Sequence, residues 1–204
     1  KPKELIKWLK SQDQTTIVIA SGDPLWFGIG RRLIEALPTK RLIFHPSISS
    51  MQLAFARLGR PWQDASWISL HGRDPAALMK RLQQRPSALA ILTDTDQGSA
   101  EEVLKVLRAL ELEDAYAFWI CERLGHQDER ISQVPSKGLI PADLDPLNLV
   151  ILLEEPALAI KPENLPLFGI NDCLFIQNED RPGLMTKREI RVQLLSDLEL
   201  PQEG

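Results

Sequence analysis

The chain has 204 residues, of which 44% are hydrophobic and 25% are charged, a composition typical of a folded globular protein rather than a disordered or fibrous one. Its formal net charge is −4 and its basic residues are scattered among acidic ones, which argues against a nucleic-acid partner. The longest apolar runs fall far short of the ~20 residues that cross a bilayer, and no charged and then apolar leader opens the sequence. We therefore expect a cytoplasmic protein of two domains with no membrane partner.

Helical and apolar patterns alternate along the first part of the chain. Apolar residues at helical spacing predict helices over 2–11, 29–37 and 51–58, and short apolar runs predict buried strands over 17–20 and 42–44. Strand, helix and strand in this order predict a crossover unit.

The alternation continues in the second part. Apolar runs predict strands over 67–70, 89–92, 116–120 and 147–153. Periodic stretches between them predict helices over 75–84 and 100–110. Ser99 and Glu102 form a capping-box pattern at the start of the last of these helices. We predict an α/β sheet, then a proline-interrupted linker over 154–182 and a helix over 186–198 with an apolar stripe.

The most suggestive loop is Ser21–Gly30, which follows one predicted strand and precedes a helix. In open α/β sheets ligands bind beyond the carboxyl ends of the strands, where this loop falls. Gly22 permits close approach of a ligand to the backbone, Asp23 can accept hydrogen bonds, and Pro24 stiffens the turn. A Gly-Asp-Pro turn is also common in proteins without a ligand, so this loop alone does not define a site.

Three further loops carry polar residues. His45–Ser50 places small hydroxyl groups at the next strand end, where Ser47 or Ser49 could equally be a plain helix cap. Thr93–Gln97 carries two carboxylates that could face a cation, a ribose or solvent. Glu122–Gly125 and the nearby Asp128–Arg130 predict an internal ion-pair cluster that fixes a turn.

The sequence lacks the residue patterns expected for a disulfide framework, a metal site, a kinase or a hydrolase. Cys121 and Cys173 are too few for a disulfide framework and lack metal-ligand spacing, so we expect no metal. His45, His71 and His126 are isolated in sequence. The absence of a phosphate-binding Gly-rich loop and of a nucleophile-elbow serine argues against a kinase or a hydrolase.

Taken in order, these segments resemble the tetrapyrrole (corrin/porphyrin) methylase family, and within it the branch that methylates precorrin-6Y in cobalamin synthesis. The matching stretches are Ile19–Gly30, Pro46–Gly59, Trp62–Ala65, Ser69–Arg73, Leu92–Asp94, Glu122–Gly125 and Leu147–Val150. Ser69–Arg73 and Gln52–Arg57 favour this branch over the sister methylases.

The resemblance implies two small α/β domains, over 1–63 and 64–153, with the donor site in the cleft between them. It implies an S-adenosylmethionine-dependent C-methyltransferase that acts at ring carbon C5 and releases S-adenosylhomocysteine. The donor-contacting positions that it implies here are Ser21, Gly22, Asp23, Trp26, Ser49, Ser50, Thr93, Asp94, Asn148 and Leu153. The sulfonium is already an activated leaving group, so catalysis rests mainly on positioning and we name no catalytic base.

The two ends of the chain add further expectations. Phe168–Ile170 and Leu184–Arg191 resemble the opening of the decarboxylating C15-methyltransferase that is fused behind this enzyme in some relatives, so 154–204 is expected to be a linker and the first helix of that unit. Nothing in Lys1–Thr16 matches the strand and Gly-Pro loop that open family members, so we expect an interior piece that binds the donor better than it turns over a precorrin-type substrate.

The family commonly dimerises, which implies a homodimer. Two alternatives stay open at this point. One is a non-catalytic ligand-binding or docking domain, and the other is a sister methylase that acts on a different ring carbon.

Overall fold

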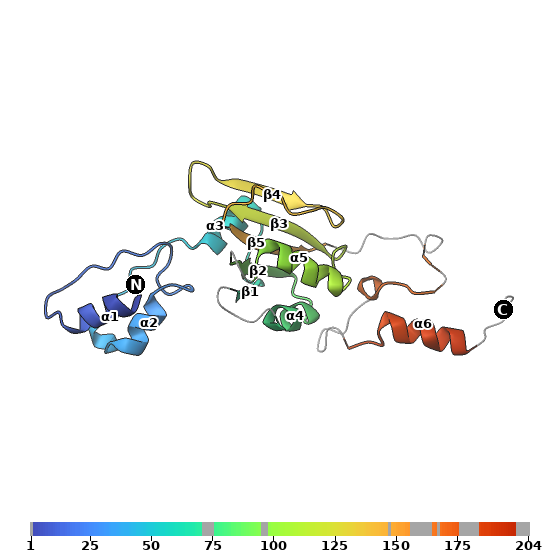
Figure 1. The fold of residues 1–204 in the computed structure, drawn as a ribbon, viewed down its shortest axis with the longest axis horizontal. Coiled ribbons are helices and arrows are strands. Elements are labelled where there is room, and N and C mark those ends of the chain that lie inside the picture. The colour runs from blue at the N-terminus through green and yellow to red at the C-terminus, as the bar shows by residue number, and fades with distance from the viewer. Residues whose placement is uncertain are drawn as a thin grey trace. The chain divides into compact units, whose positions relative to one another are not determined.

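The computed structural model describes residues 2–70, 76–94, 98–146, 148–155, 165–166, 168–175 and 184–198. The chain forms two compact units, Lys1–Pro61 and Trp62–Gly204 (Figure 1). Parts of several predictions lie outside the described residues: His71 and its neighbours in Ser69–Arg73, residues 95–97, Leu147, and most of the linker.

Helices form the regular structure described in the first unit. They are α1 (Pro2–Lys10), α2 (Gly30–Ala36), the short 3-10 helix η1 (Thr39–Arg41) and α3 (Ser50–Arg57). The three predicted helices are confirmed. In α3, the apolar residues Met51, Ala54 and Phe55 follow the helical period and are buried, which gives the helix one apolar face.

The strands predicted over 17–20 and 42–44 are wrong. Both segments are irregular, and Ile17, Ile19 and Ile43 are 86%, 93% and 84% exposed. The hydrogen bonds described for this unit include none between the two segments. A short apolar run becomes a strand only when neighbouring backbone satisfies its N–H and C=O groups, and a two-stranded ribbon by itself is marginal.

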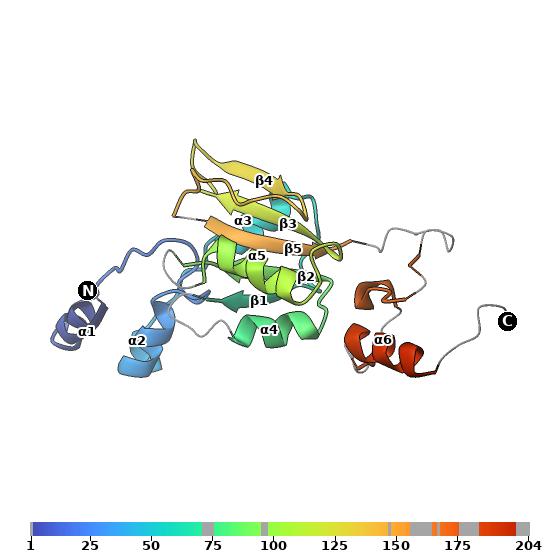
Figure 2. The same cartoon turned by 45° about the vertical axis from the view of Figure 1, so that its right-hand side comes forward.

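A five-stranded sheet forms the centre of the second unit (Figure 2). Its strands are β1 (Ser66–Ser69), β2 (Ala88–Leu92), β3 (Tyr116–Glu122), β4 (Arg130–Val134) and β5 (Asn148–Glu154), in the order β1-β2-β5-β3-β4. β1 and β2 are parallel, and the other pairs are antiparallel. The predicted α/β class is confirmed. Strand β4 was not predicted, because this edge strand carries polar residues and lacks a clear apolar alternation.

Helices α4 (Ala76–Gln83) and α5 (Ala100–Ala109) pack together and belong to the main core. Alternate strand residues, such as Ile91, Phe118 and Val150, join that core. Their neighbours Ile151 and Leu149 are buried as well, so β5 is covered on both faces, as its continuous apolar sequence predicts.

The predicted cap of α5 is confirmed in a slightly different form. The Ser99 hydroxyl accepts from the N–H of Glu102 at 3.4 Å, and the Glu102 carboxylate accepts from the N–H of Gly98 at 2.6 Å rather than from that of Ser99. Two backbone donors at the helix start are thereby satisfied.

The last described elements are the 3-10 helix η3 (Asp172–Leu174) and α6 (Arg188–Asp197), which confirms the predicted C-terminal helix. Its apolar residues Ile190, Leu194 and Leu198 are exposed. None of the described helices has the length and apolar character needed to span a membrane.

Candidate functional site

The Gly-Asp-Pro loop of the first unit is a tight turn closed by its own backbone. Gly22 has a φ of +65°, in the left-handed region that favours glycine, although a side chain there would meet no atom within 4 Å. Its conformation, rather than limited space, therefore calls for glycine. The N–H of Trp26 donates to the carbonyl of Asp23 at 3.2 Å, and that of Gly30 donates to Pro24 at 2.8 Å.

The Asp23 carboxylate joins two loops that are far apart in sequence. One oxygen accepts from the N–H of Leu25 at 2.8 Å, and the other accepts from the N–H of Ser47 at 3.2 Å. Residues 21–30 and 45–50 are thereby held side by side. Asp23 was predicted as an acceptor for a ligand, and in the structure its carboxylate connects the two loops.

The serines of the second loop have different surroundings. Ser49 is 4% exposed and caps α3, since its hydroxyl accepts from the N–H of Gln52 at 3.3 Å and the Gln52 side chain accepts from the N–H of Ser49 at 2.9 Å. The capping alternative for Ser49 is confirmed. Ser50 is the first residue of α3 and is half-buried. Trp26 packs edge-on against Phe27 with ring centroids 4.9 Å apart, while Ser21 is exposed.

In the second unit, Thr93 and Asn148 meet where β2 ends and β5 begins. The Thr93 hydroxyl lies 2.8 Å from the backbone carbonyl oxygen of Asn148 and 2.7 Å from its side-chain oxygen, and its single proton is shared between these two acceptors. The N–H of the neighbouring Asp94 donates to the carbonyl of Gly98 at 3.1 Å. The structure thus brings together three of the predicted site residues.

Leu153 does not join them. It pairs with Ala88 at the start of β2, whereas Leu149 pairs with Leu92 at its end. Four residues of strand separate the two positions, about 13 Å. Leu153 therefore lies at the opposite end of β5 from Thr93, Asp94 and Asn148.

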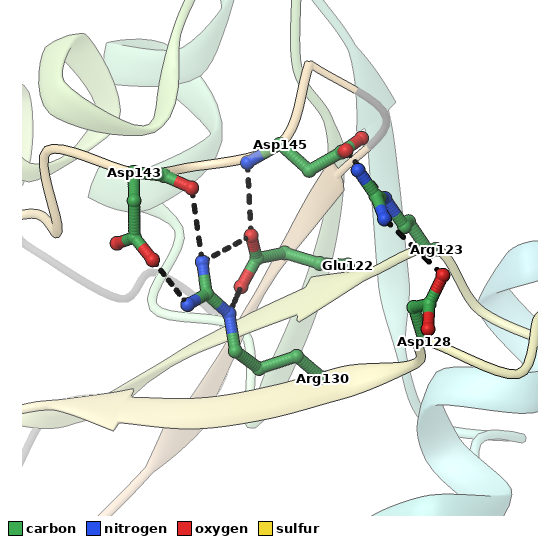
Figure 3. A pocket seen from close by; sticks show the side chains of 6 residues that line it. All are labelled: Glu122, Arg123, Asp128, Arg130, Asp143 and Asp145. Carbon is green, nitrogen blue, oxygen red and sulfur yellow. Dashed lines mark hydrogen bonds and ion pairs between the residues drawn. The ribbon is translucent and has the colours of Figure 1, made fainter.

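An ion pair between a buried carboxylate and an exposed guanidinium lies at the end of β3 (Figure 3). The Arg130 side chain is 43% exposed. Glu122 is 2% exposed and accepts from Arg130 twice, at 2.6 and 2.8 Å, and once from the N–H of Asp145 at 2.9 Å. The guanidinium also donates to the Asp143 carboxylate at 2.7 Å. The predicted ion-pair cluster is present, and Asp143 and Asp145 are members that were not predicted. It is not internal, because Glu122 is buried while the side chains of Arg130 and Asp143 are exposed.

Arg123 forms the second arm of this cluster. It pairs with Asp145 at 2.5 Å and more loosely with Asp128 at 3.5 Å. The six charged residues line a pocket of about 270 Å³. The signal that could have identified the missed members is the acidic pair Asp143 and Asp145, placed directly before a strongly apolar strand.

These contacts shift two carboxyl pKa values downward. Burial by itself raises the pKa of Glu122, but hydrogen bonds from Arg130 and from the Asp145 N–H outweigh burial, so its pKa is lowered. The hydrogen bond from Arg130 also lowers the pKa of Asp143. Burial raises the pKa of the adjacent Cys121 thiol to about 12, so this cysteine is a protonated, apolar filler.

The Glu122 shift predicts how stability depends on pH. A carboxyl group whose folded pKa lies below its unfolded value, about 4.3 for glutamate, stabilises the fold above that value and loses this contribution as pH falls through the folded pKa. The difference in free energy of unfolding between wild type and Glu122→Gln should therefore be full at pH 7 and shrink below about pH 4. Urea titrations from pH 7 to 3 measure it, and a difference independent of pH would contradict the assignment.

Among the described residues, no group of three or more His, Cys, Asp or Glu side chains is placed to hold a metal ion. The polar groups instead bind one another and the backbone. Such contacts can hold loops in place for a ligand. Among the described contacts, no nucleophilic side chain is hydrogen-bonded to a general base.

The chain matches a known protein family. Residues 3–139 match the model of the tetrapyrrole (corrin/porphyrin) methylases. The chain belongs to this family, which confirms the resemblance recognised in its sequence.

Two methyltransferases are similar to this chain in sequence. The chain is 32% identical over 203 residues to a precorrin-6Y C(5,15)-methyltransferase [decarboxylating] of Sinorhizobium sp, covering 99% of this chain and 47% of that protein. It is 30% identical over 152 residues to the cobalt-precorrin-7 C(5)-methyltransferase of Salmonella typhimurium, covering 74% of this chain and 72% of that one. The chain thus spans about half the length of the first relative and most of the second.

A solved structure supports the fold. The uroporphyrin-III C-methyl transferase from Thermus thermophilus, crystallised with S-adenosylhomocysteine, superposes with a TM-score of 0.56 at 19% identity, over 75% of this chain and 71% of that one.

Proposed function

We propose that this chain is the methyl-donor-binding part of an S-adenosylmethionine-dependent C-methyltransferase of cobalamin synthesis, which methylates a precorrin-type ring at C5. The observation that carries the proposal is the match of nearly the whole chain to a precorrin-6Y methyltransferase, together with a match to a C5-specific enzyme. The family and the fold support it as well, since the Thermus relative was crystallised with S-adenosylhomocysteine, the product of the donor.

The donor-contacting residues that we propose are given for each unit by itself. In the first unit they are Ser21, Gly22, Asp23, Trp26, Ser49 and Ser50. In the second unit they are Thr93, Asp94 and Asn148. Leu153 stays a prediction of the resemblance, since the register of β5 sets it apart from the other three residues of its unit.

When bound, the donor supplies a methyl group on a sulfonium, which is a good leaving group. The contribution of the protein is then to bind, orient and exclude water. Positioning of this kind is worth about 7 to 11 kcal/mol in well-oriented reactions. Asp23 supports it by fixing two loops at once, and Thr93 and Asn148 support it by holding each other in one arrangement.

The partners follow from the same relatives. We propose a precorrin-type substrate and a decarboxylating C15-methyltransferase unit, fused or associated, because the name of the Sinorhizobium protein includes both activities. We also propose that 1–63 and 64–153 are the two methylase subdomains, that 154–204 leads into that further unit, and that the protein acts in the cytoplasm as a homodimer.

Calorimetric titration of the full-length protein with S-adenosylmethionine tests the donor site. Asp23→Ala should weaken donor affinity about tenfold or more, because it removes a charged acceptor and releases the 45–50 loop. Asp13→Ala is the matched control, the same substitution at an exposed carboxylate of the same unit, and should bind like wild type. If Asp23→Ala binds S-adenosylmethionine as tightly as a binding-competent wild type does, the Gly-Asp-Pro loop is not part of the donor site.

A further inference from the structure

A row of polar side chains crosses one end of the sheet of the second unit. Arg130 of β4 lies opposite Glu122 of β3, and Glu122 lies opposite Asn148 of β5. Thr93, directly after β2, donates to Asn148. Directly opposite residues of antiparallel strands point to the same face. Four neighbouring segments of chain therefore contribute one polar residue each to a single row.

The backbone of Asp145 completes the row between Glu122 and Asn148. Its N–H donates to Glu122 at 2.9 Å, and its carbonyl accepts from the side-chain amide of Asn148 at 2.7 Å. That amide is thereby oriented with its oxygen toward Thr93, whose hydroxyl donates to it at 2.7 Å. Each member of the row is held by the next (Figure 3 shows its Arg130, Glu122 and Asp145 members).

We propose that the Glu122–Arg130 ion pair positions Asn148 and Thr93 for the methyl donor, acting through the backbone of Asp145. This inference rests on the proposed function. Glu122 and Arg130 are positioning residues, since their own contacts run to each other, to Asp143 and to Asp145.

The physical reason is rigidity. The Glu122 carboxylate is buried and held by charge-assisted hydrogen bonds from two directions, so it can occupy few positions. The segment before β5 is anchored to it. A polar side chain reaches a ligand with the right geometry only when a second layer of contacts fixes its rotamer, and the Asp145 carbonyl does this for the Asn148 amide.

The double variant Glu122→Leu/Arg130→Met separates positioning from stability. It replaces both charges with apolar groups, which leaves no buried charge unpaired and preserves most of the stability. It also removes the acceptor that anchors Asp145. We expect an unfolding midpoint near that of wild type and a dissociation constant for S-adenosylmethionine raised about tenfold. Asp128→Asn, which alters the same pocket without touching the row, should bind the donor like wild type.

Asn148→Asp tests the same link from the other end. The substitution keeps an oxygen for Thr93 but removes the N–H groups that bind Asp145. Donor affinity should fall by a similar factor, and combining it with the double variant should add little, because both break one chain of contacts. In the wild-type protein the side-chain amide signal of Asn148 in a 1H–15N spectrum should be sharp, and in Glu122→Leu/Arg130→Met it should shift.

The outcomes are distinguishable. If wild type does not bind S-adenosylmethionine, the proposed function fails and this inference fails with it. If wild type binds and the folded double variant binds equally well with an unmoved Asn148 amide signal, the positioning role alone is overturned. If the double variant is folded but binds S-adenosylmethionine more weakly, while Asp128→Asn binds it like wild type, the positioning role is supported.

Discussion

Replacing Arg130 alone with methionine is expected to destabilise the second unit strongly. Glu122, 2% exposed, would then keep a buried charge without its counter-ion, while its remaining contact would be the N–H of Asp145. Loss of the charged partner of a buried carboxylate costs about 2 kcal/mol when that partner is itself exposed, as Arg130 is, and this is a sizeable share of the stability of a small domain. Urea unfolding at pH 7, followed by circular dichroism, measures the loss.

The double variant Glu122→Leu/Arg130→Met supplies the control. Removing both charges should recover most of the stability lost in Arg130→Met, because the penalty comes from the unpaired charge rather than from the missing pair itself. If the double variant is no more stable than the single one, the ion pair is not the reason for the loss. Recovery of stability in the double variant would mean that the ion pair serves positioning rather than net stability.

Gly98→Ala is expected to have a comparable effect by a steric route. Gly98 has a φ of +89°, and a Cβ atom added there would lie 2.4 Å from the Cβ of Leu70, which is buried and cannot move far. Strain of the backbone and overpacking of the core together should cost about 3 kcal/mol. The carbonyl of Gly98 accepts from the N–H of Asp94, so Asp94 should shift and donor affinity should fall as well.

Gly59→Ala is the matched control for this substitution. Gly59 also has a positive φ, +61°, but an added Cβ would meet nothing within 4 Å. It carries the conformational cost alone, about 1 kcal/mol. Thermal unfolding of the two variants compares them directly, and equal losses would show that the contact with Leu70 does not matter.

Much of the secondary structure was predictable, because it depends on local pattern. The amphipathic period gave all six α-helices among the described residues to within two residues at each end, and the capping residues Ser49 and Ser99 mark where two of them begin. Strands β1, β2, β3 and β5 followed from short apolar runs. The residue order around Glu122 and Arg130 indicated an ion-pair cluster, since opposite charges a few residues apart commonly meet across a turn.

Features that depend on contacts between distant segments of the chain could not be predicted from local pattern. The apolar runs at 17–20 and 42–44 look like strands but lack paired backbone, and the polar edge strand β4 exists because β3 supplies its partner. The separation of Leu153 from Thr93 follows from the antiparallel register of β2 and β5, which no single segment contains. The same holds for Asp23, whose bond to Ser47 spans two loops.

The sequence by itself determined the family, the helices and the loops expected to bind the donor, because ordered motifs and hydrophobic periods are properties of the chain. Only the tertiary structure decided which of those residues lie together, that Asp23 joins two loops, and that hydrogen bonds through Asp145 link the Glu122–Arg130 ion pair to Asn148 and Thr93. The physical reason is that hydrogen bonds and burial depend on distances between segments. Those distances are set by strand order and register once the sheet has formed.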